Sequence, residues 1–180
     1  MFYKELIAAG FGGQGVMVLG QLVAYGGIED GRNVTWIPSY GPEMRGGTAN
    51  CSTVVSDEPV GSPVISMCDV VVILNQPSLA KFEHAARKGG ILIYNSDLVK
   101  YDNPRTDVRV IGIPAQKIAT ELGSDKVANV VLLGAVVEAS GIISKKSAVH
   151  VVEEKLGKRK PQFLPMNLKA LDRGMEAAKA

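Results

Sequence analysis

The fold class is indicated by residues 6–20, LIAAGFGGQGVMVLG. Leu6–Ala9 is a short apolar run that predicts a strand, and from Gly13 to Ile28 apolar side chains recur at helical spacing. Between the two, Gly10–Gly15 matches the pattern G-x-G-x-x-G. A strand that leads through a glycine-rich turn into a helix is typical of the first unit of an α/β domain.

The same alternation of strand-like and helix-like segments continues along the chain. The branched run over 69–74 is typical of a strand that is covered on both faces, as in a parallel sheet. The sequence therefore predicts an α/β, Rossmann-like fold with a mostly parallel sheet and helices on both faces. Further strands are expected at 33–37 (ending at Pro38), 49–56, 91–94 and 108–113, and further helices at 77–88 (stopped by Gly89-Gly90), 115–122, 127–140, 144–156 and 164–178.

For two of these expected helices, the sequence does not decide between packing in the core and contact with a partner. The segment 127–140 is apolar almost all round, which favours either burial in the core or contact with a partner. The tail after Pro161 is amphipathic and is more often core-facing than intermolecular. The basic run over 157–161 is interpreted as a solvated turn between helices.

Composition excludes several classes of protein. The 180 residues suit one domain and can bury about 70% of their extended surface, so no metal or disulfide is needed to hold the fold. With 46% apolar and 21% charged residues the chain is not disordered. Its 20 basic and 18 acidic residues provide no basic footprint for nucleic acid or a membrane surface. No signal peptide and no apolar run of about 20 residues is found, so a cytoplasmic location is expected.

Cysteine and histidine usage argues against a metal or cluster site in this chain. The two cysteines, Cys51 and Cys68, are far apart and form no C-x-x-C pair. They are expected to be small core residues, and iron–sulfur or structural zinc ligation by this chain is not expected. His84 and His150 are distant in sequence, and His84 is expected on an exposed helix face.

The glycine-rich loop is the first chemical signal. Its glycines let the backbone approach a ligand closely, and the following helix would present free N–H groups to an anion. A dinucleotide site also needs an acid at the end of the second strand, but that strand ends Trp36-Ile37-Pro38-Ser39. Glu29 and Asp30 precede the strand, which is the wrong end. The loop is therefore weak evidence for NAD or FAD, and a purely structural tight turn stays open beside an anion-binding role.

The second signal is Tyr40–Gly47, directly after the second expected strand. In a parallel sheet this is the carboxyl edge, where open α/β folds place their sites. The segment combines an aromatic, an acid and an arginine between turn residues, and Arg45 can fork two hydrogen bonds to a carboxylate or phosphate. We interpret the segment as a site or an interface. No catalytic residue is assigned, because the chain holds no Ser-His-Asp set, nucleophile elbow, P-loop lysine or thiamine diphosphate motif.

Together the two segments carry a family resemblance. GFGGQGVMVLGQLVAYGGIEDG (10–31) and VTWIPSYGPEMRGGTANCSTVVSDEPVGSP (34–63) resemble the gamma subunit of 2-oxoacid:ferredoxin oxidoreductases. The resemblance covers nearly the whole chain and implies one domain over residues 1–180, of the pyruvate/ketoisovalerate oxidoreductase gamma type. The string over 38–47 is most similar to the 2-oxoglutarate branch (2-oxoglutarate synthase). It is less similar to the pyruvate and indolepyruvate branches, and a branched-chain 2-oxoacid enzyme also stays open.

The resemblance implies a division of labour. Thiamine diphosphate, magnesium and iron–sulfur clusters would be held by alpha and beta subunits, with or without a ferredoxin-like delta subunit. The complex would reversibly decarboxylate 2-oxoglutarate, reduce ferredoxin and form succinyl-CoA, and this chain alone would be inactive. It also implies that the two loops receive coenzyme A or close the entrance to the active site. The candidate residues are Gly12, Gly13, Gln14, Gly15, Tyr40, Gly41, Glu43, Arg45, Gly46 and Gly47.

Two rival hypotheses from other classes are kept. The first is a free-standing NAD- or flavin-dependent oxidoreductase, against which the missing acid argues. The second is a non-catalytic adaptor whose glycine turn is only structural. Replacement of Arg45 in an assembled complex separates this adaptor from a coenzyme A-contacting subunit.

Overall fold

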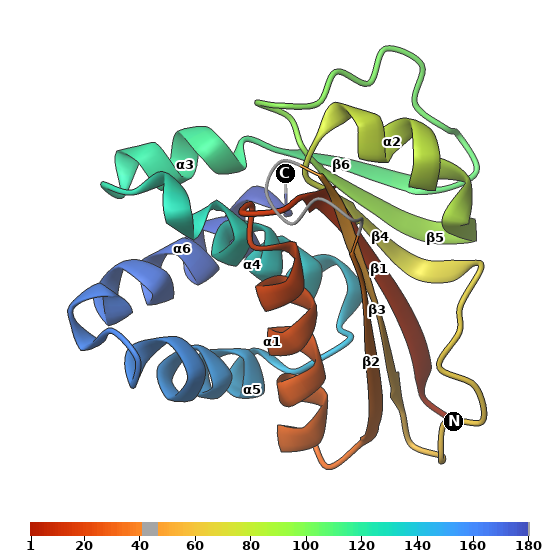
Figure 1. Cartoon of the computed structure of the whole chain (residues 1–180), viewed down its shortest axis with the longest axis horizontal. Coiled ribbons are helices and arrows are strands. Elements are labelled where there is room, and N and C mark those ends of the chain that lie inside the picture. The colour runs from red at the N-terminus through yellow and green to blue at the C-terminus, as the bar shows by residue number, and fades with distance from the viewer. Residues whose placement is uncertain (41–46, 180) are drawn as a thin grey trace.

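The computed structural model describes residues 1–40 and 47–179 of the chain. Within these residues the strands form one six-stranded sheet in the spatial order β2-β3-β1-β4-β5-β6 (Figure 1). The predicted α/β class is confirmed. The strands are β1 (Tyr3–Phe11), β2 (Asn33–Tyr40), β3 (Thr48–Ser56), β4 (Cys68–Ile73), β5 (Ala86–Asn95) and β6 (Arg109–Ile113).

Most neighbouring strands in the sheet are parallel, as predicted. β1, β4, β5 and β6 run in one direction. β3 lies between β1 and β2 and is antiparallel to both, which the sequence did not indicate. Because two reversals cancel, β2 runs in the direction of β1 and ends at the same edge of the sheet. Phe11 is paired with Thr48, and Tyr40 with Ala49, so the ends of β1 and β2 flank the start of β3.

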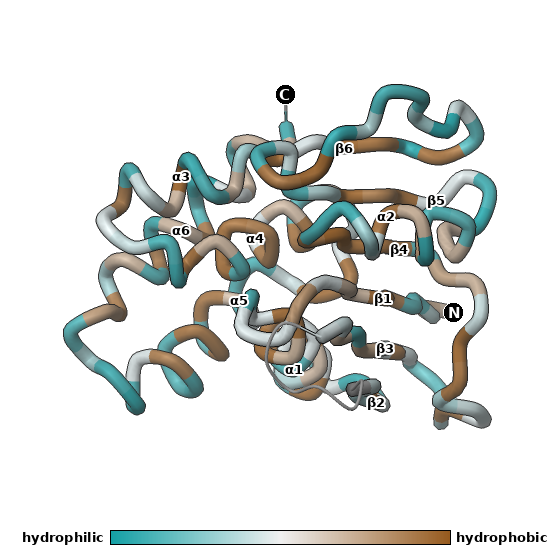
Figure 2. Tube along the Cα trace, turned by 45° about the horizontal axis from the view of Figure 1, so that its top comes forward, coloured by the Kyte–Doolittle hydropathy of each residue, from teal (hydrophilic) through white to brown (hydrophobic). Residues whose placement is uncertain are grey.

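Helices cover both faces of the sheet, again as predicted. One face carries α1 (Val16–Glu29), α3 (Ala115–Glu121), α4 (Ala128–Ser140), α5 (Lys145–Val151) and α6 (Leu164–Ala177), whereas α2 (Gln76–Phe82) lies on the other (Figures 1 and 2). Alternate residues of the central strands supply two separate apolar clusters, one for each face. Short 3-10 turns at Glu83–Ala85, Asp125–Val127 and Pro161–Phe163, and a π-helical turn at Val152–Gly157, complete the helical segments.

The apolar helix α4 is a core element of the domain itself. Its side chains from Val130 to Val136 are almost completely buried, and Figure 2 shows it as an apolar stretch between the sheet and α6. α6 crosses α4 so closely that a Cβ on Gly134 would lie 2.9 Å from the Met175 nitrogen. Leu171, on the apolar face of α6, is fully buried in the same cluster. The open question about these two helices is thus answered by packing within the chain.

The predicted end of the second strand is wrong. β2 continues through Pro38 to Tyr40. Proline cannot donate a ladder hydrogen bond, but β2 lies at the edge of the described sheet, and at an edge a proline is tolerated.

The predicted helix over 77–88 is also too long. α2 ends at Phe82, and β5 begins at Ala86, so Gly89-Gly90 lies inside a strand. Gly89 has φ +79°, and a Cβ on Gly90 would lie 2.9 Å from the Asp69 carbonyl oxygen. The β4–β5 register shifts at this point. The glycine pair therefore accommodates an irregular, close strand pairing and is not a helix stop.

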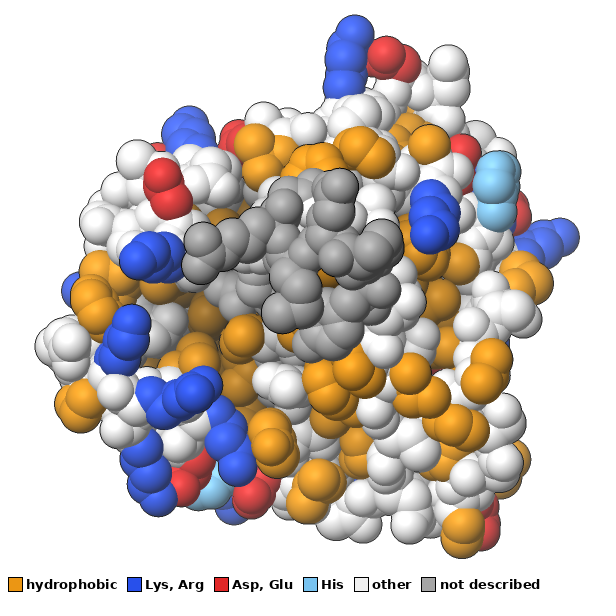
Figure 3. Space-filling view, viewed as in Figure 1, with side chains coloured by type: hydrophobic (Ala, Val, Ile, Leu, Met, Phe, Trp, Pro, Cys, Tyr) orange, Lys and Arg blue, Asp and Glu red, His pale blue; other side chains and the backbone are white. Residues whose placement is uncertain are grey.

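The helix expected over 144–156 is α5 followed by the π-helical turn, and the basic turn after it is solvated. Lys158, Arg159 and Lys160 are exposed, and Lys158 forms an ion pair with Glu154. Figure 3 shows basic side chains gathered at the lower left, over the α5 side of the molecule. The exposure of these three side chains confirms the interpretation as a solvated turn. The ion pair is itself exposed and contributes little to stability.

Both cysteines are buried and free, as expected, and the His84 side chain is exposed. Burial raises the pKa of Cys51 to about 11 and that of Cys68 to about 12. In residues 1–40 and 47–179, no helix is both long enough and apolar enough to cross a bilayer. The same residues contain no group of three or more His, Cys, Asp or Glu side chains placed to hold a metal ion.

Candidate functional site

The candidate site lies where the chain leaves β1 and β4 in opposite directions. After β1 the chain turns to α1 on one face of the sheet, and after β4 it turns to α2 on the other (Figure 1). β1 and β4 are parallel neighbours, so their carboxyl ends lie side by side. In open α/β sheets such a divergence leaves a crevice, which is the usual ligand site.

The glycine loop after β1 has a backbone that only glycine adopts readily. Gly13 has φ +97° and Gly15 has φ +80°, both in the left-handed region. A Cβ on Gly10 would lie 2.9 Å from the Leu74 side chain, so this position needs glycine for space. Among the described residues none lies within 4 Å of a Cβ placed on Gly13, whereas Gly15 is enclosed by the side chain of Asn129. The described part of the loop is thus closely packed near Gly10 and Gly15 and less so at Gly13.

Gln14 joins the two diverging loops. Its Oε1 accepts a hydrogen bond from the Phe11 backbone N–H at 2.7 Å and one from Asn75 Nδ2 at 3.4 Å. Its Nε2 donates to the Leu74 carbonyl oxygen at 3.2 Å. Asn75 in turn caps α2 by accepting from the Ser78 N–H at 2.9 Å. In the described residues Gln14 therefore acts as a link between the β1–α1 and β4–α2 loops.

The two segments singled out in the sequence meet in the structure. The Gly12 N–H donates to the Gly47 carbonyl oxygen at 3.0 Å. Tyr40 ends β2 at the same edge, one register position from the start of β3. The remaining predicted residues, Gly41, Glu43, Arg45 and Gly46, lie outside the described residues.

Among the described residues, no side chain caps the first turn of α1. Gly15 is its N-cap residue and offers no side-chain cap, and the first helical hydrogen bond runs from the Leu19 N–H to the Gly15 carbonyl oxygen at 2.9 Å. No acid occupies the first turn. Free N–H groups and the positive end of the helix dipole favour a phosphate or carboxylate at such a position.

The structure disfavours a dinucleotide interpretation of this loop. In the usual nucleotide-binding arrangement the second strand lies beside the first and places its terminal acid near the ribose. Here β3 separates β2 from β1, and the described end of β2 carries Ser39 and no acid. Glu29 and Asp30 lie at the far end of α1 from the glycine loop.

Sequence reasoning missed Asn129. It is the second residue of α4, it is only 7% exposed, and its Nδ2 donates to the Gly15 carbonyl oxygen at 3.3 Å. A lone polar side chain in the first turn of an otherwise apolar helix was the available signal.

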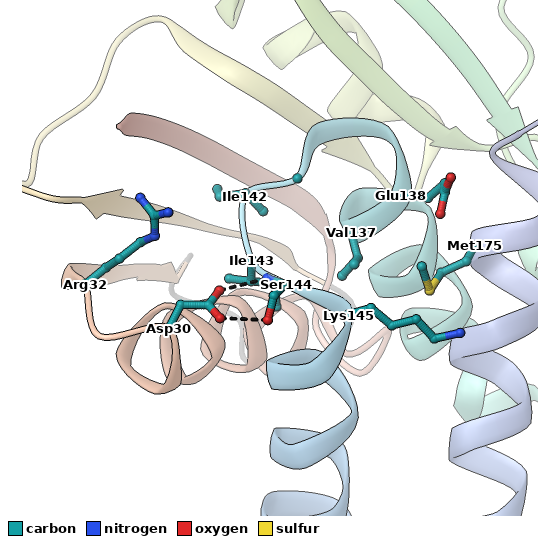
Figure 4. Close-up of a pocket in the computed structure, with 10 residues that line it drawn as sticks. Asp30, Arg32, Val137, Glu138, Ile142, Ile143, Ser144, Lys145 and Met175 are labelled. Atoms are coloured by element: carbon teal, nitrogen blue, oxygen red, sulfur yellow. Dashed lines mark hydrogen bonds between the residues drawn. The ribbon is translucent and has the colours of Figure 1, made fainter. Parts of the chain in front are cut away.

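A cavity of about 480 Å³ lies at the opposite end of α1 and is not part of this site (Figure 4). Asp30, on its wall, accepts hydrogen bonds from the Ser144 N–H at 2.7 Å and from the Ser147 hydroxyl at 2.6 Å. Partial burial opposes ionisation, but the hydrogen bonds from Ser147 and Ser144 hold the pKa of Asp30 below its usual value. Arg32 and Lys145 on the same wall are paired with aspartates elsewhere. The Asp30 carboxylate therefore connects the end of α1 to the first turn of α5.

Comparison with known proteins assigns the chain to a family. Residues 5–177 match the model of the pyruvate ferredoxin/flavodoxin oxidoreductase family. The chain belongs to this family. The α/β architecture of a solved oxidoreductase gamma chain from Geobacter sulfurreducens PCA, described as keto/oxoacid ferredoxin oxidoreductase, gamma subunit, is similar over 98% of both chains, with 31% identity and a TM-score of 0.85.

Curated members of the oxidoreductase family differ in substrate and length. Ketoisovalerate oxidoreductase subunit VorA of Methanothermobacter thermautotrophicus is 40% identical over 173 residues, which are 95% of this chain and 35% of VorA. 2-Oxoglutarate synthase subunit KorC of Methanocaldococcus jannaschii is 35% identical over 179 residues, 98% of this chain and 94% of KorC. The chain therefore spans about a third of VorA and nearly all of KorC.

A longer solved member of the family is described with its ligands. 2-Oxoglutarate:ferredoxin oxidoreductase from Magnetococcus marinus has 2-oxoglutarate, coenzyme A and succinyl-CoA bound. It matches 99% of this chain and 31% of its own chain, with 26% identity and a TM-score of 0.90.

Proposed function

We propose that this chain is the gamma subunit of a multi-subunit 2-oxoacid:ferredoxin oxidoreductase and contributes a coenzyme A-contacting surface. The family membership and the full-length similarity to a gamma chain support this proposal. The observation that carries it is the meeting of the glycine loop with the end of the Tyr40–Gly47 segment, through the hydrogen bond between Gly12 and Gly47 beside the first turn of α1.

The proposed complex joins three steps. A 2-oxoacid loses carbon dioxide, its two electrons pass one at a time to two ferredoxins, and the acyl group is transferred to the sulfur of coenzyme A, whose thiol proton is released. Thiamine diphosphate, magnesium and iron–sulfur clusters would be held by the alpha and beta subunits, with or without a delta subunit. In this proposal the chain supplies no reacting group and takes part by binding and orienting coenzyme A.

The chemistry of the two loops suits the phosphates of coenzyme A. Backbone N–H groups at a helix N-terminus bind phosphate without needing a charged side chain. A guanidinium at Arg45 would add a forked, charge-assisted contact. Gly13 and Gly15 are proposed as the backbone contacts, Gly12 as the position that joins the two loops through its hydrogen bond to Gly47, and Tyr40, Gly41, Glu43, Gly46 and Gly47 as the flanking positions. Gln14 is proposed to hold the loop in place through its contacts with Phe11, Leu74 and Asn75.

For the 2-oxoacid we propose 2-oxoglutarate, with succinyl-CoA as the product. The similarity to KorC along nearly the whole of both chains, and the resemblance of residues 38–47, support it. A branched-chain 2-oxoacid such as ketoisovalerate is the second candidate, favoured by the higher identity to VorA. Turnover of the two acids by the assembled complex, compared as kcat/KM, distinguishes them.

The experiment is reconstitution of this chain with the alpha and beta subunits of the proposed complex. We expect no coenzyme A-dependent viologen reduction by the chain alone and restored turnover in the complex. Arg45→Ala is expected to raise the KM for coenzyme A by about tenfold, as for loss of one charge-assisted contact. The matched control is Lys169→Ala, a cation removed from the exposed face of α6. Turnover by the solitary chain would contradict the division of labour, and an unchanged KM would favour the adaptor hypothesis.

A further inference from the structure

Asn129 stands apart in an apolar helix. Between Ala128 and Val137 it is the only polar side chain, and residues 130–137 are almost completely buried. Asn129 is itself 7% exposed. A buried amide is costly unless it is hydrogen-bonded, so a polar residue at this position calls for a specific contact.

That contact is with the glycine loop, 114 residues earlier in the chain. Asn129 Nδ2 donates to the Gly15 carbonyl oxygen at 3.3 Å. The same oxygen accepts the first helical hydrogen bond of α1, from Leu19. A Cβ on Gly15 would lie 2.7 Å from Asn129 Cγ and 2.9 Å from its Cβ, so the amide packs directly against the Gly15 backbone. Within the described residues, Asn129 Oδ1 makes no hydrogen bond.

The contact brings the amino ends of two helices together. Gly15 caps α1, and Asn129 lies in the first turn of α4. Toward the other end of α1, Gly26 packs against Ile143, which lies three residues after the end of α4. Two adjoining amino ends place both positive dipole ends near one point, which favours a negative charge there.

We propose that Asn129 is a positioning residue for phosphate recognition by the glycine loop. It holds Gly15 so that the N–H groups of the first turn of α1 face the ligand, and it brings the dipole of α4 to the same place. The ligand class is a phosphate-bearing thiol, which rests on the proposed role of this chain in binding coenzyme A. The phosphates would supply the negative charge that two adjoining positive helix ends favour.

The chemistry of an amide suits this task better than that of a carboxylate. An asparagine can donate to the Gly15 carbonyl oxygen, whereas an ionised aspartate of nearly the same shape is only an acceptor. Aspartate would also place a negative charge where the phosphate is proposed to bind. Asn129→Asp therefore changes charge and donor capacity with little change in volume, and Asn129→Ala removes the donor without adding charge.

The test compares two acyl acceptors in the assembled complex. Coenzyme A carries phosphates, and pantetheine carries the same thiol arm without them. We expect Asn129→Asp to lower kcat/KM for coenzyme A about tenfold, and Asn129→Ala about threefold. kcat/KM for pantetheine is expected to change less than twofold in both variants. Gln162→Glu, an exposed site with the same change in charge, is the matched control and should alter neither acceptor.

Several results would overturn the inference. A purely structural role for Asn129 would lower kcat/KM for both acceptors alike, and no role would leave both unchanged. If Asn129→Asp fails to assemble, Asn129→Ala and Asn129→Ser provide the same comparison. If Arg45→Ala selectively affects coenzyme A while the Asn129 variants do not, the positioning role fails and the proposed function stands. If neither does, the coenzyme A role of this chain fails as well.

Discussion

Replacing Gly15 by alanine should lower the free energy of unfolding more than the same change at Gly13. Both glycines have positive φ, so alanine pays a backbone cost of about 1–2 kcal/mol at either position. At Gly13 no residue that the structure describes lies within 4 Å of the added Cβ. At Gly15 the Cβ overlaps the side chain of Asn129 and displaces the hydrogen bond to the Gly15 carbonyl oxygen. The displaced bond and the repacking add about 1–2 kcal/mol.

The expected free energy of unfolding therefore falls by about 1–2 kcal/mol in Gly13→Ala and about 2–4 kcal/mol in Gly15→Ala. For a chain of this length, the extra loss corresponds to a melting temperature lower by about 2–8 °C. Urea unfolding of the purified chain, followed by circular dichroism, measures the first quantity, and a thermal scan measures the second.

A double variant tests the cause. If the overlap with Asn129 is responsible, Asn129→Ala should be less destabilising in the Gly15→Ala background than in the wild type, because the amide contact is already lost there. The reasoning is refuted if Gly15→Ala and Gly13→Ala are equally stable, or if the effects of the Gly15 and Asn129 changes are simply additive.

Three further predictions follow from buried and packed groups. The pKa of Asp30 is lowered in the folded chain, so the ionised carboxylate stabilises the fold above its unfolded pKa of about 3.9, and this stabilisation is lost as the pH falls through the lower folded pKa. Asp30→Asn should therefore lower the melting temperature most near pH 7 and least below pH 4. A decrease in melting temperature that does not vary with pH would contradict this. Because burial raises the pKa of Cys51 to about 11 and that of Cys68 to about 12, iodoacetamide at pH 8 should label neither thiol in the native chain and both in urea, as read by mass spectrometry; rapid native labelling would show that the thiols are accessible. Gly174→Ala should destabilise the chain by about 1–3 kcal/mol in urea unfolding despite the better helix propensity of alanine, because its Cβ would lie 2.7 Å from the Val131 carbonyl carbon of α4; a gain in stability would show that the two helices separate easily.

Local patterns in the chain were sufficient to predict most strands and helices and the glycine-rich turn between the first strand and the first helix. The apolar run before Gly10, the left-handed positions at Gly13 and Gly15, and the helix after them each depend on neighbours within a few residues. The all-apolar character of α4 likewise predicted its burial, since a helix without a polar face cannot lie on a solvated surface.

The extents of some elements depended on distant partners. The β-rich residues 49–56 gave no sign that β3 would insert antiparallel between β1 and β2, because strand order is decided by pairing across the sheet. Gly89-Gly90 suggested a helix stop, yet the contact with the Asp69 carbonyl oxygen on β4 places the pair within β5. Pro38 suggested a strand end, and only the edge position of β2 lets the strand continue.

By itself, then, the amino-acid order determined where most strands and helices lie and that a glycine turn joins the first strand to the first helix, since both depend on short-range sterics and side-chain periodicity. Only the tertiary structure decided that the loop after β1 joins Gly47 across the start of β3, that Gln14 links it to the β4–α2 loop, and that Asn129 packs against Gly15. These contacts connect residues between 35 and 114 positions apart. Their geometry comes from the packing of the sheet and of α1 against α4, which no local pattern encodes.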